Sequence, residues 1–189
     1  MKKLMMTLIL VPTLLAGCGA DATSSGIETR INDELGVDAH VPQTFDYPIG
    51  IASIEYGFHM EDGDVVLDDP FFANIQYQLA TEEPFEGIDR EAWEEEHRSE
   101  IIYGDFYQEP SVVSMRISKD SFGSIIDAGT QTISGHVVQY QFLQRDANDI
   151  VIIGFDIENV GYLLNYQLID GQTEEDAQAF ASEIIEYYQ

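Results

Sequence analysis

The chain has 189 residues, and its 35 Asp and Glu outnumber its 8 Lys and Arg to give a formal net charge of −27. Nucleic-acid binding needs clustered Lys and Arg to displace counterions from phosphates, and anionic lipid headgroups repel the same negative field. Composition therefore excludes a nucleic-acid-binding protein and electrostatic attachment to a membrane. A hydrophobic fraction of 44%, with ten Phe and ten Tyr, favours one folded domain over disorder.

The first residues follow the pattern of a targeting segment. Lys2 and Lys3 form a positive start, and a short apolar run from Leu4 to Leu15 follows them before small residues. A membrane-spanning helix needs roughly 20 consecutive apolar residues, and this run is shorter. We therefore predict a signal peptide over residues 1–17 that is removed from the mature protein.

Cys18 is the only cysteine, and it ends the tetrapeptide Leu15-Ala16-Gly17-Cys18. This tetrapeptide resembles the lipobox of bacterial lipoproteins, in which the signal peptide is cut before the cysteine and the thiol receives a diacylglyceryl group. The resemblance implies attachment through acyl chains on Cys18 to the extracytoplasmic face of the cell membrane or cell envelope. Each buried methylene contributes about 0.8 kcal/mol, so two chains hold a protein stably. The alternative is an ordinary secretory signal with cleavage elsewhere.

Removal of residues 1–17 leaves six basic side chains against 35 acidic ones, a net charge of −29 with His neutral. A carboxylate-rich surface of this kind keeps an extracytoplasmic protein soluble at high salt or high pH. Small and polar residues follow the cysteine, which predicts a flexible tether over residues 18–26. Residues 27–189 are then a single globular domain.

The first half of this domain predicts one helix and then strands. Ile27, Ile31 and Leu35 recur at intervals of four, as on one face of a short helix. Residues 49–58 are rich in β-branched and aromatic side chains, and residues 65–67 are apolar. The two stretches flank an Asp-Gly turn, which predicts a hairpin. Alternating apolar and polar residues predict a further strand over 71–80.

The second half predicts a helix, a meander of strands and a final helix. Asp89 caps a helix that runs to Ile101 and ends at Gly104. The connection 118–129 holds one helical turn, and Thr173 starts an amphipathic helix. The expected strands lie at residues 112–117, 136–142, 151–157 and 162–168. The predicted fold class is α+β, an antiparallel curved sheet with helices packed on one face.

Several of these patterns together resemble a known domain. They are a Gly-started strand (135–142), an apolar strand that ends in an aromatic residue (151–155), a Gly-Tyr strand (161–166) and the final helix. They resemble the C-terminal half of a domain of unknown function in membrane-anchored proteins of Gram-positive bacteria, itself similar to the lipoprotein-carrier fold. The resemblance covers about residues 110–189, and this chain has Phe155 where the family often has Trp. It implies helices across the concave face of a curved sheet, with an apolar cleft between the layers, and offers no catalytic residues.

Two acidic clusters are candidate metal ligands. Asp62, Asp64, Asp68 and Asp69 supply carboxylates around the predicted turn, as a hard cation such as Ca²⁺ requires, but they lack the spacing of an EF-hand. Glu94 and the nearby His97 lie three residues apart on the predicted acidic helix and could share a metal. A solvated helix face on which Glu94 pairs with Arg98, four positions later, is the favoured explanation of that pair. No cofactor is predicted.

The sequence carries no Gly-x-Ser-x-Gly, Ser-x-x-Lys or His-Glu-x-x-His motif, and its one cysteine belongs to the predicted lipobox. We therefore predict no catalytic residues and a non-enzymatic binding or accessory module of the cell envelope, with a cell-envelope protein or a cation as partner. The alternative is a carrier or sensor of lipid or another amphiphile in a cleft between sheet and helices, whose small-molecule ligand the sequence does not specify. The spacing of the tyrosines that could line such a cleft favours core packing instead, namely for Tyr140, Tyr162, Tyr166, Tyr187 and Tyr188.

Overall fold

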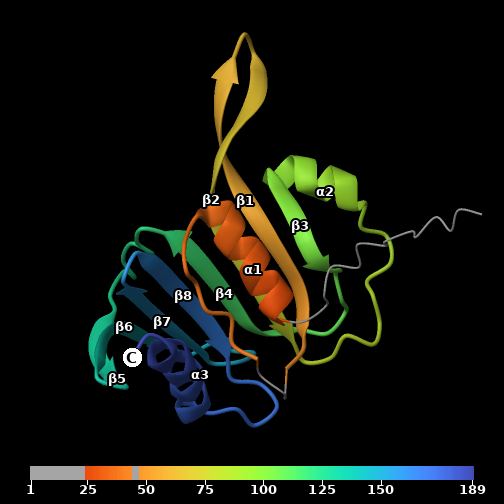
Figure 1. The fold of residues 1–189 in the computed structure, drawn as a ribbon. Helices are drawn as coiled ribbons and strands as arrows, with labels where there is room; N and C mark the ends of the chain where they lie inside the picture. The colour runs from red at the N-terminus through yellow and green to blue at the C-terminus, as the bar shows by residue number, and fades with distance from the viewer. Residues whose placement is uncertain (1–23, 44–46) are drawn as a thin grey trace, which may run out of the picture.

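The computed structural model describes residues 24–43 and 47–189. The helices are α1 (Ser24–Leu35), α2 (Arg90–His97) and α3 (Glu174–Tyr187). The strands are β1 (Ile49–Glu61), β2 (Asp64–Gln78), β3 (Ser99–Gly104), β4 (Ser111–Lys119), β5 (Gly129–Ile133), β6 (His136–Leu143), β7 (Ile150–Ile157) and β8 (Val160–Gln167). They form one eight-stranded antiparallel sheet in the order β3-β1-β2-β4-β8-β7-β6-β5 (Figure 1). The predicted α+β class is confirmed.

Helices α1 and α3 cover one face of the sheet (Figure 1). The interval of four predicted for α1 is confirmed, since Ile27, Ile31 and Leu35 are all buried. Helix α3 begins with a capping box between Thr173 and Asp176 and buries its apolar face. The core lies between these two helices and the inward side chains of the sheet.

The predicted boundary between tether and domain needs one correction. Residues 24–26 were expected to belong to the tether, but α1 begins at Ser24. The hydroxyl of Thr29 donates to the carbonyl oxygen of Ser25 at 2.8 Å, which ties this turn to the next one. The predicted signal peptide (1–17), Cys18 and the tether up to residue 23 lie outside the described residues.

The predicted helix from Asp89 to Ile101 is right only in its first part. Asp89 caps α2 as expected, and its side chain accepts the N–H of Ala92. The helix ends at His97, because Arg98 adopts a left-handed conformation with φ of 50°. The following stretch is rich in β-branched and aromatic residues and pairs with β1 as strand β3. Tertiary pairing therefore replaces the last turn of the predicted helix.

Two further differences concern strands. The predicted segments 65–67 and 71–80 are joined in the single strand β2, which passes Pro70 where the register against β1 shifts. The connection 118–129 contains no helical turn, and β5 follows it as an edge strand. Four of the five β5 residues are exposed, so this strand lacks the alternating pattern that predicts a strand.

The face of the sheet opposite α1 and α3, which we call the outer face, is covered at both ends and open in the middle. Over β7 and β8, Phe122 packs on Gly154 and Gly161, where an added Cβ would lie 2.3 Å from the Phe122 ring and 2.1 Å from its backbone nitrogen. Asp156 holds this loop by accepting the N–H of Phe122 at 2.9 Å and the hydroxyl of Ser121 at 2.8 Å. At the other end, α2 lies beside β3 (Figure 1).

The hairpin of β1 and β2 extends beyond the rest of the sheet. Pairing of β1 with β3 ends at Glu55, and pairing of β2 with β4 begins at Phe72. The two strands remain paired with each other out to Glu61 and Asp64. Residues 57–69, which we call the arm, therefore project from the body of the molecule (Figure 1).

Candidate functional site

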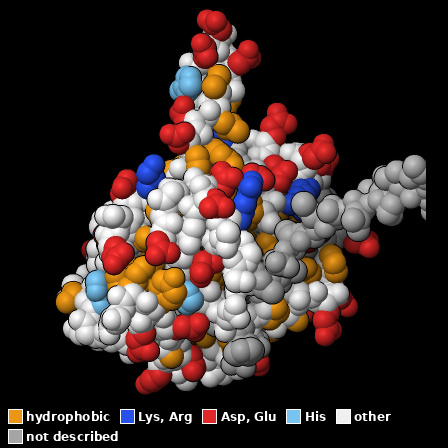
Figure 2. Space-filling view, in the orientation of Figure 1, with side chains coloured by type: hydrophobic (Ala, Val, Ile, Leu, Met, Phe, Trp, Pro, Cys, Tyr) orange, Lys and Arg blue, Asp and Glu red, His pale blue; other side chains and the backbone are white. Residues whose placement is uncertain are grey.

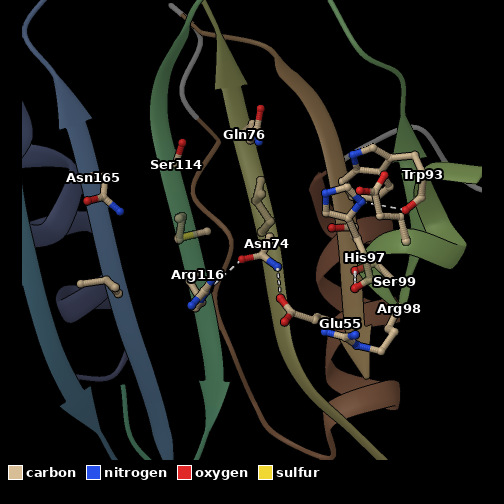
Figure 3. Close-up of a pocket in the computed structure, with 15 residues that line it drawn as sticks. Glu55, Asn74, Gln76, Trp93, His97, Arg98, Ser99, Ser114, Arg116 and Asn165 are labelled. Carbon is tan, nitrogen blue, oxygen red and sulfur yellow. Dashed lines mark hydrogen bonds between the residues drawn. The ribbon is translucent and has the colours of Figure 1, made fainter. Parts of the chain in front are cut away.

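The open middle of the outer face holds a groove with a volume of about 540 Å³. This volume lies in the range of small-molecule sites, about 300–1,000 Å³. Strands β1, β2, β4 and β8 form its floor, and α2 contributes its wall (Figure 3). The polar floor residues that matter most here are Ser53, Asn74, Gln76, Ser114, Arg116 and Asn165.

Strand register arranges these side chains in two rows. Gln76 lies opposite Ser114, and Ser114 lies opposite Asn165, which gives the amide row on β2, β4 and β8. Directly opposed residues of neighbouring strands point to the same face of a sheet. The three side chains accordingly point to one side in Figure 3. They offer amide and hydroxyl groups in a continuous line across the sheet.

The second row, the arginine row, consists of Ser53, Asn74 and Arg116, which are opposed across β1, β2 and β4. The Arg116 Nε–H donates to Asn74 Oδ1 at 3.0 Å, and Asn74 Nδ2 donates to Glu55 Oε2 at 3.4 Å (Figure 3). The Arg116 guanidinium also lies 4.6 Å from the centre of the Phe72 ring. These contacts fix the orientation of the Asn74 amide and of the guanidinium before any ligand arrives.

The amide row is less occupied by internal contacts. Gln78 Nε2 donates to Gln76 Oε1 at 3.3 Å, and the hydroxyls of Ser114 and Ser111 lie 3.3 Å apart. Asn165 is half-buried, and within residues 24–43 and 47–189 its side chain makes no hydrogen bond. Its donor and acceptor groups therefore both remain available to a ligand in the groove.

Aromatic rings form the wall of the groove. Trp93, the only tryptophan of the chain, stacks on His97 with ring centroids 4.3 Å apart and an interplanar angle of 17°. The ring of Phe106 packs edge-on against Trp93 at 5.1 Å. His97 Nδ1 lies 2.8 Å from the carbonyl oxygen of Trp93, which orients the imidazole. The rings of Trp93 and His97 thus stand beside the polar floor.

The structure does not bring the predicted Glu94 and His97 pair together as metal ligands. Glu94 Oε1 accepts the backbone N–H of Ile101 at 2.8 Å and lies 3.5 Å from Arg90 Nε. His97 instead stacks on the tryptophan. The expected pairing of Glu94 with Arg98 is absent too, since the Arg98 guanidinium lies 4.1 Å from the centre of the Phe58 ring.

The groove differs in charge from the rest of the molecule. Its carboxylates within the described part of the chain are Glu55 and Glu96, and they are balanced by Arg98 and Arg116. Neither guanidinium forms an ion pair with a described carboxylate, although the chain has 35 acidic side chains. By contrast, Asp and Glu are spread over the face with α1 and α3 and along the arm (Figure 2). The groove is therefore a charge-balanced region of an acidic protein.

The predicted metal candidates Asp62, Asp64, Asp68 and Asp69 all lie on the arm. Asp68 Oδ1 lies 2.8 Å from Nδ1 of His59, so its carboxylate is engaged across the hairpin. Across the described ranges, no group of three or more His, Cys, Asp or Glu side chains is placed to hold a metal ion. The hairpin was predicted correctly, but it spreads these carboxylates along an exposed arm.

The arm also exposes four large apolar side chains. Phe58 lies opposite Leu67, and Met60 lies opposite Val65, so all four share one face of the hairpin. Their exposed fractions are 47% for Phe58, 59% for Met60, 54% for Val65 and 53% for Leu67. A two-stranded hairpin with such a face gains little stability in water without a partner.

The tyrosines proposed for an amphiphile cleft belong mainly to the core. Tyr140, Tyr162 and Tyr166 are buried, while Tyr187 is exposed. Burial, together with the neighbouring Tyr188, raises the pKa of the Tyr162 hydroxyl well above its ordinary value. The space between α3 and the sheet is filled by these rings and by α3 side chains that are themselves buried, namely Phe180, Ile184 and Ile185.

Comparison of the chain with protein-family models, with curated proteins and with solved structures finds no match. The resemblances of Cys18 to a lipobox and of residues 110–189 to a membrane-anchored domain stay predictions, and Cys18 lies outside the described residues. Among residues 24–43 and 47–189, no helix is both long and apolar enough to cross a membrane. The groove itself was not predicted. The only signal for it was the uncharged outward positions of the strand at 71–80, namely Asn74, Gln76 and Gln78.

Proposed function

We propose that the protein is a non-enzymatic binding module of the cell envelope, held at the extracytoplasmic face by acyl chains on Cys18, and that it binds its ligand in the outer-face groove. The observation that carries this proposal is the charge-balanced, amide-lined groove in a chain of net charge −27. Solubility alone would favour carboxylates there, as on other surfaces of this protein. Neutral polar side chains and two guanidiniums at one concave place are better explained by a ligand.

The ionisable groups of the groove are suited to recognition. Glu55 is engaged by the Asn74 amide, and His97 is engaged by the Trp93 carbonyl oxygen and by ring stacking. A general base must instead point at the proton that it removes, within hydrogen-bond distance. The amides and hydroxyls of the floor can bind a ligand without transferring a proton.

The proposal is tested with the full-length Cys18→Ser protein, which lacks the acyl chains. We expect it to co-sediment with the salt-washed insoluble envelope of the cells that express it. The triple variant Gln76→Ala, Ser114→Ala, Asn165→Ala removes the amide row and should lose this co-sedimentation. Gln131→Ala with Thr132→Ala, on the exposed edge strand β5, is the matched control and should retain it.

Two results would contradict the proposal. One is equal co-sedimentation of the triple variant and its control, which would place binding elsewhere on the molecule. The other is turnover of ester, peptide or glycosidic substrates by the purified protein in a broad screen, with the activity lost in a groove variant. Circular dichroism of each variant establishes that the fold is intact.

A second candidate function, docking to an envelope protein, is favoured by the arm. Its apolar face lies beside the carboxylates of Glu61, Asp62 and Asp64 at the exposed tip. Like charges repel a second copy and anionic lipid headgroups, whereas a protein surface that combines apolar side chains with Lys and Arg complements the arm. The proposed occupant is therefore a basic surface of an envelope protein.

This second candidate is tested by a photo-crosslinking amino acid placed at Met60 in cells, with Val137 as the control position because it is also an exposed apolar strand residue. We expect a protein adduct at position 60 alone, and its yield should fall as salt is raised. Adducts of equal yield at both positions, or adducts with lipid, would exclude the proposed docking. No observation comparably favours the amphiphile carrier, because side chains fill the space between α3 and the sheet.

A further inference from the structure

We infer that the ligand of the outer-face groove is an uncharged saccharide. This inference rests on the proposed function, because it names the chemical class of ligand for the same groove. It follows from the hydrogen-bonding groups of the floor, the charge balance of the lining, the aromatic wall and the position of the groove on the sheet.

The floor matches a ligand that donates and accepts hydrogen bonds at many closely spaced points. Each Asn or Gln amide offers two N–H donors and an acceptor oxygen, and a Ser hydroxyl both donates and accepts. The hydroxyls of a saccharide have the same dual character. The amide row places such groups on neighbouring strands, which are about 4.8 Å apart, so successive hydroxyls of an extended saccharide can be met in turn.

Charge argues against an ionic ligand of either sign. An anion would meet the field of a chain with net charge −27, and the Arg116 guanidinium is already engaged by Asn74 and Phe72. A cation would meet Arg98 and Arg116 in the same lining as Glu55 and Glu96, and Glu55 is engaged by the Asn74 amide. An uncharged ligand suits a lining in which two carboxylates and two guanidiniums balance.

The wall and the position of the groove distinguish a saccharide from a peptide. The rings of Trp93 and His97 both line the groove, and an aromatic ring suits the C–H face of a sugar ring. A peptide that joins a sheet binds through backbone groups at an open strand edge. The groove lies over β2 and β4 instead, whose backbones are paired on both sides, so only side chains are available there.

The groove contains its own reporter, because Trp93 is the only tryptophan. The full-length Cys18→Ser protein is titrated with three neutral tetrasaccharides, built from glucose, mannose or N-acetylglucosamine, while tryptophan emission is followed. Tetragalacturonate and tetra-alanine serve as anionic and peptide probes. We expect a saturable change in emission with at least one neutral tetrasaccharide and none with the other two probes.

Asn165→Ala is the decisive variant, because it removes a side chain that makes no hydrogen bond within the described residues and should therefore leave the fold intact. We expect binding to weaken about fivefold to tenfold, as for hydrogen bonds to one amide. Gln131→Ala, an exposed amide on β5, should bind as the unaltered protein does.

The inference is overturned if no neutral tetrasaccharide changes the emission, if tetragalacturonate or tetra-alanine binds in preference, or if Asn165→Ala binds unchanged. These outcomes are distinguishable from failure of the proposed function. If co-sedimentation with the envelope depends on the amide row but neutral tetrasaccharides do not compete with it, the saccharide inference fails and the proposed binding function stands. Co-sedimentation that does not depend on the amide row would instead contradict the proposed function itself.

Discussion

At the scale of single residues, Tyr162 connects the sheet to both ends of the chain. Its hydroxyl accepts the backbone N–H of His40 at 2.7 Å and lies 2.7 Å from the hydroxyl of Tyr188, which donates to the carbonyl oxygen of Asp38 at 2.7 Å. Tyr162→Phe leaves these partly buried groups without their partner. We expect the free energy of unfolding to fall by about 1–3 kcal/mol in urea denaturation.

Tyr187→Phe is the control for this substitution, because Tyr187 is exposed and its hydroxyl makes no hydrogen bond within the described part of the chain. It should leave the free energy of unfolding unchanged. Equal stability of Tyr162→Phe and the unaltered protein would show that the hydroxyl network contributes nothing to the fold.

Phenol ionisation predicts how stability depends on pH. Burial, with a hydrogen bond to Glu100, raises the pKa of Tyr56 to about 12, and burial with a hydrogen bond to Glu174 raises that of Tyr140 to about 12. Because these folded-state values exceed the unfolded value of about 10, the stabilisation is complete below about pH 10 and is lost as pH rises through the folded pKa.

We therefore expect the free energy of unfolding to decline from about pH 10 towards pH 12. Denaturant titrations at stepped pH measure it, and phenolate absorbance reports the ionisation directly. The double variant Tyr56→Phe, Tyr140→Phe should show a shallower decline. An identical decline in the double variant would assign the alkaline transition to other groups.

At the scale of elements, the loop that carries Phe122 controls which part of the outer face is open. An added Cβ at Gly161 meets the Phe122 backbone nitrogen at 2.1 Å, which a side-chain movement cannot relieve. An added Cβ at Gly154 meets only the ring, which can turn away. We expect Gly161→Ala to cost about 1–3 kcal/mol in thermal unfolding and Gly154→Ala clearly less. The reverse order would mean that the loop does not pack as described.

Elements with strong local patterns could be predicted from the sequence, and elements defined by tertiary pairing could not. Helix α3 has a capping box and a continuous apolar face, so its sequence alone determines it. Strand β3 was assigned to a helix because the acidic run before it favours a helix and its pairing with β1 is not a local property. Gln76 and Asn165 belong to one row because β4 lies between β2 and β8, and no local sequence pattern reveals that strand order.

At the scale of the whole molecule, the surface is divided between an acidic exterior and a groove that is balanced in charge (Figure 2). Asp and Glu are spread over the helix-bearing face and the arm (Figure 2), while the groove on the opposite face is balanced in charge. A lipid attachment at Cys18 would concentrate this binding face at the envelope without electrostatic help. In the triple variant that lacks the amide row, and so should not bind the envelope through the groove, Cys18→Ser should therefore move the protein from the membrane fraction to the soluble fraction, with unchanged thermal stability. An unchanged membrane fraction would contradict attachment through this residue.

The most direct test of the account is a map of amide chemical shifts in the full-length Cys18→Ser protein during addition of solubilised envelope fragments. Binding in the groove should shift the amide signals of Gln76, Ser114 and Asn165 and the indole N–H signal of Trp93, all on the outer face. Shifts confined to α3 residues such as Phe180 and Ile184 would place the ligand between helix and sheet and contradict it.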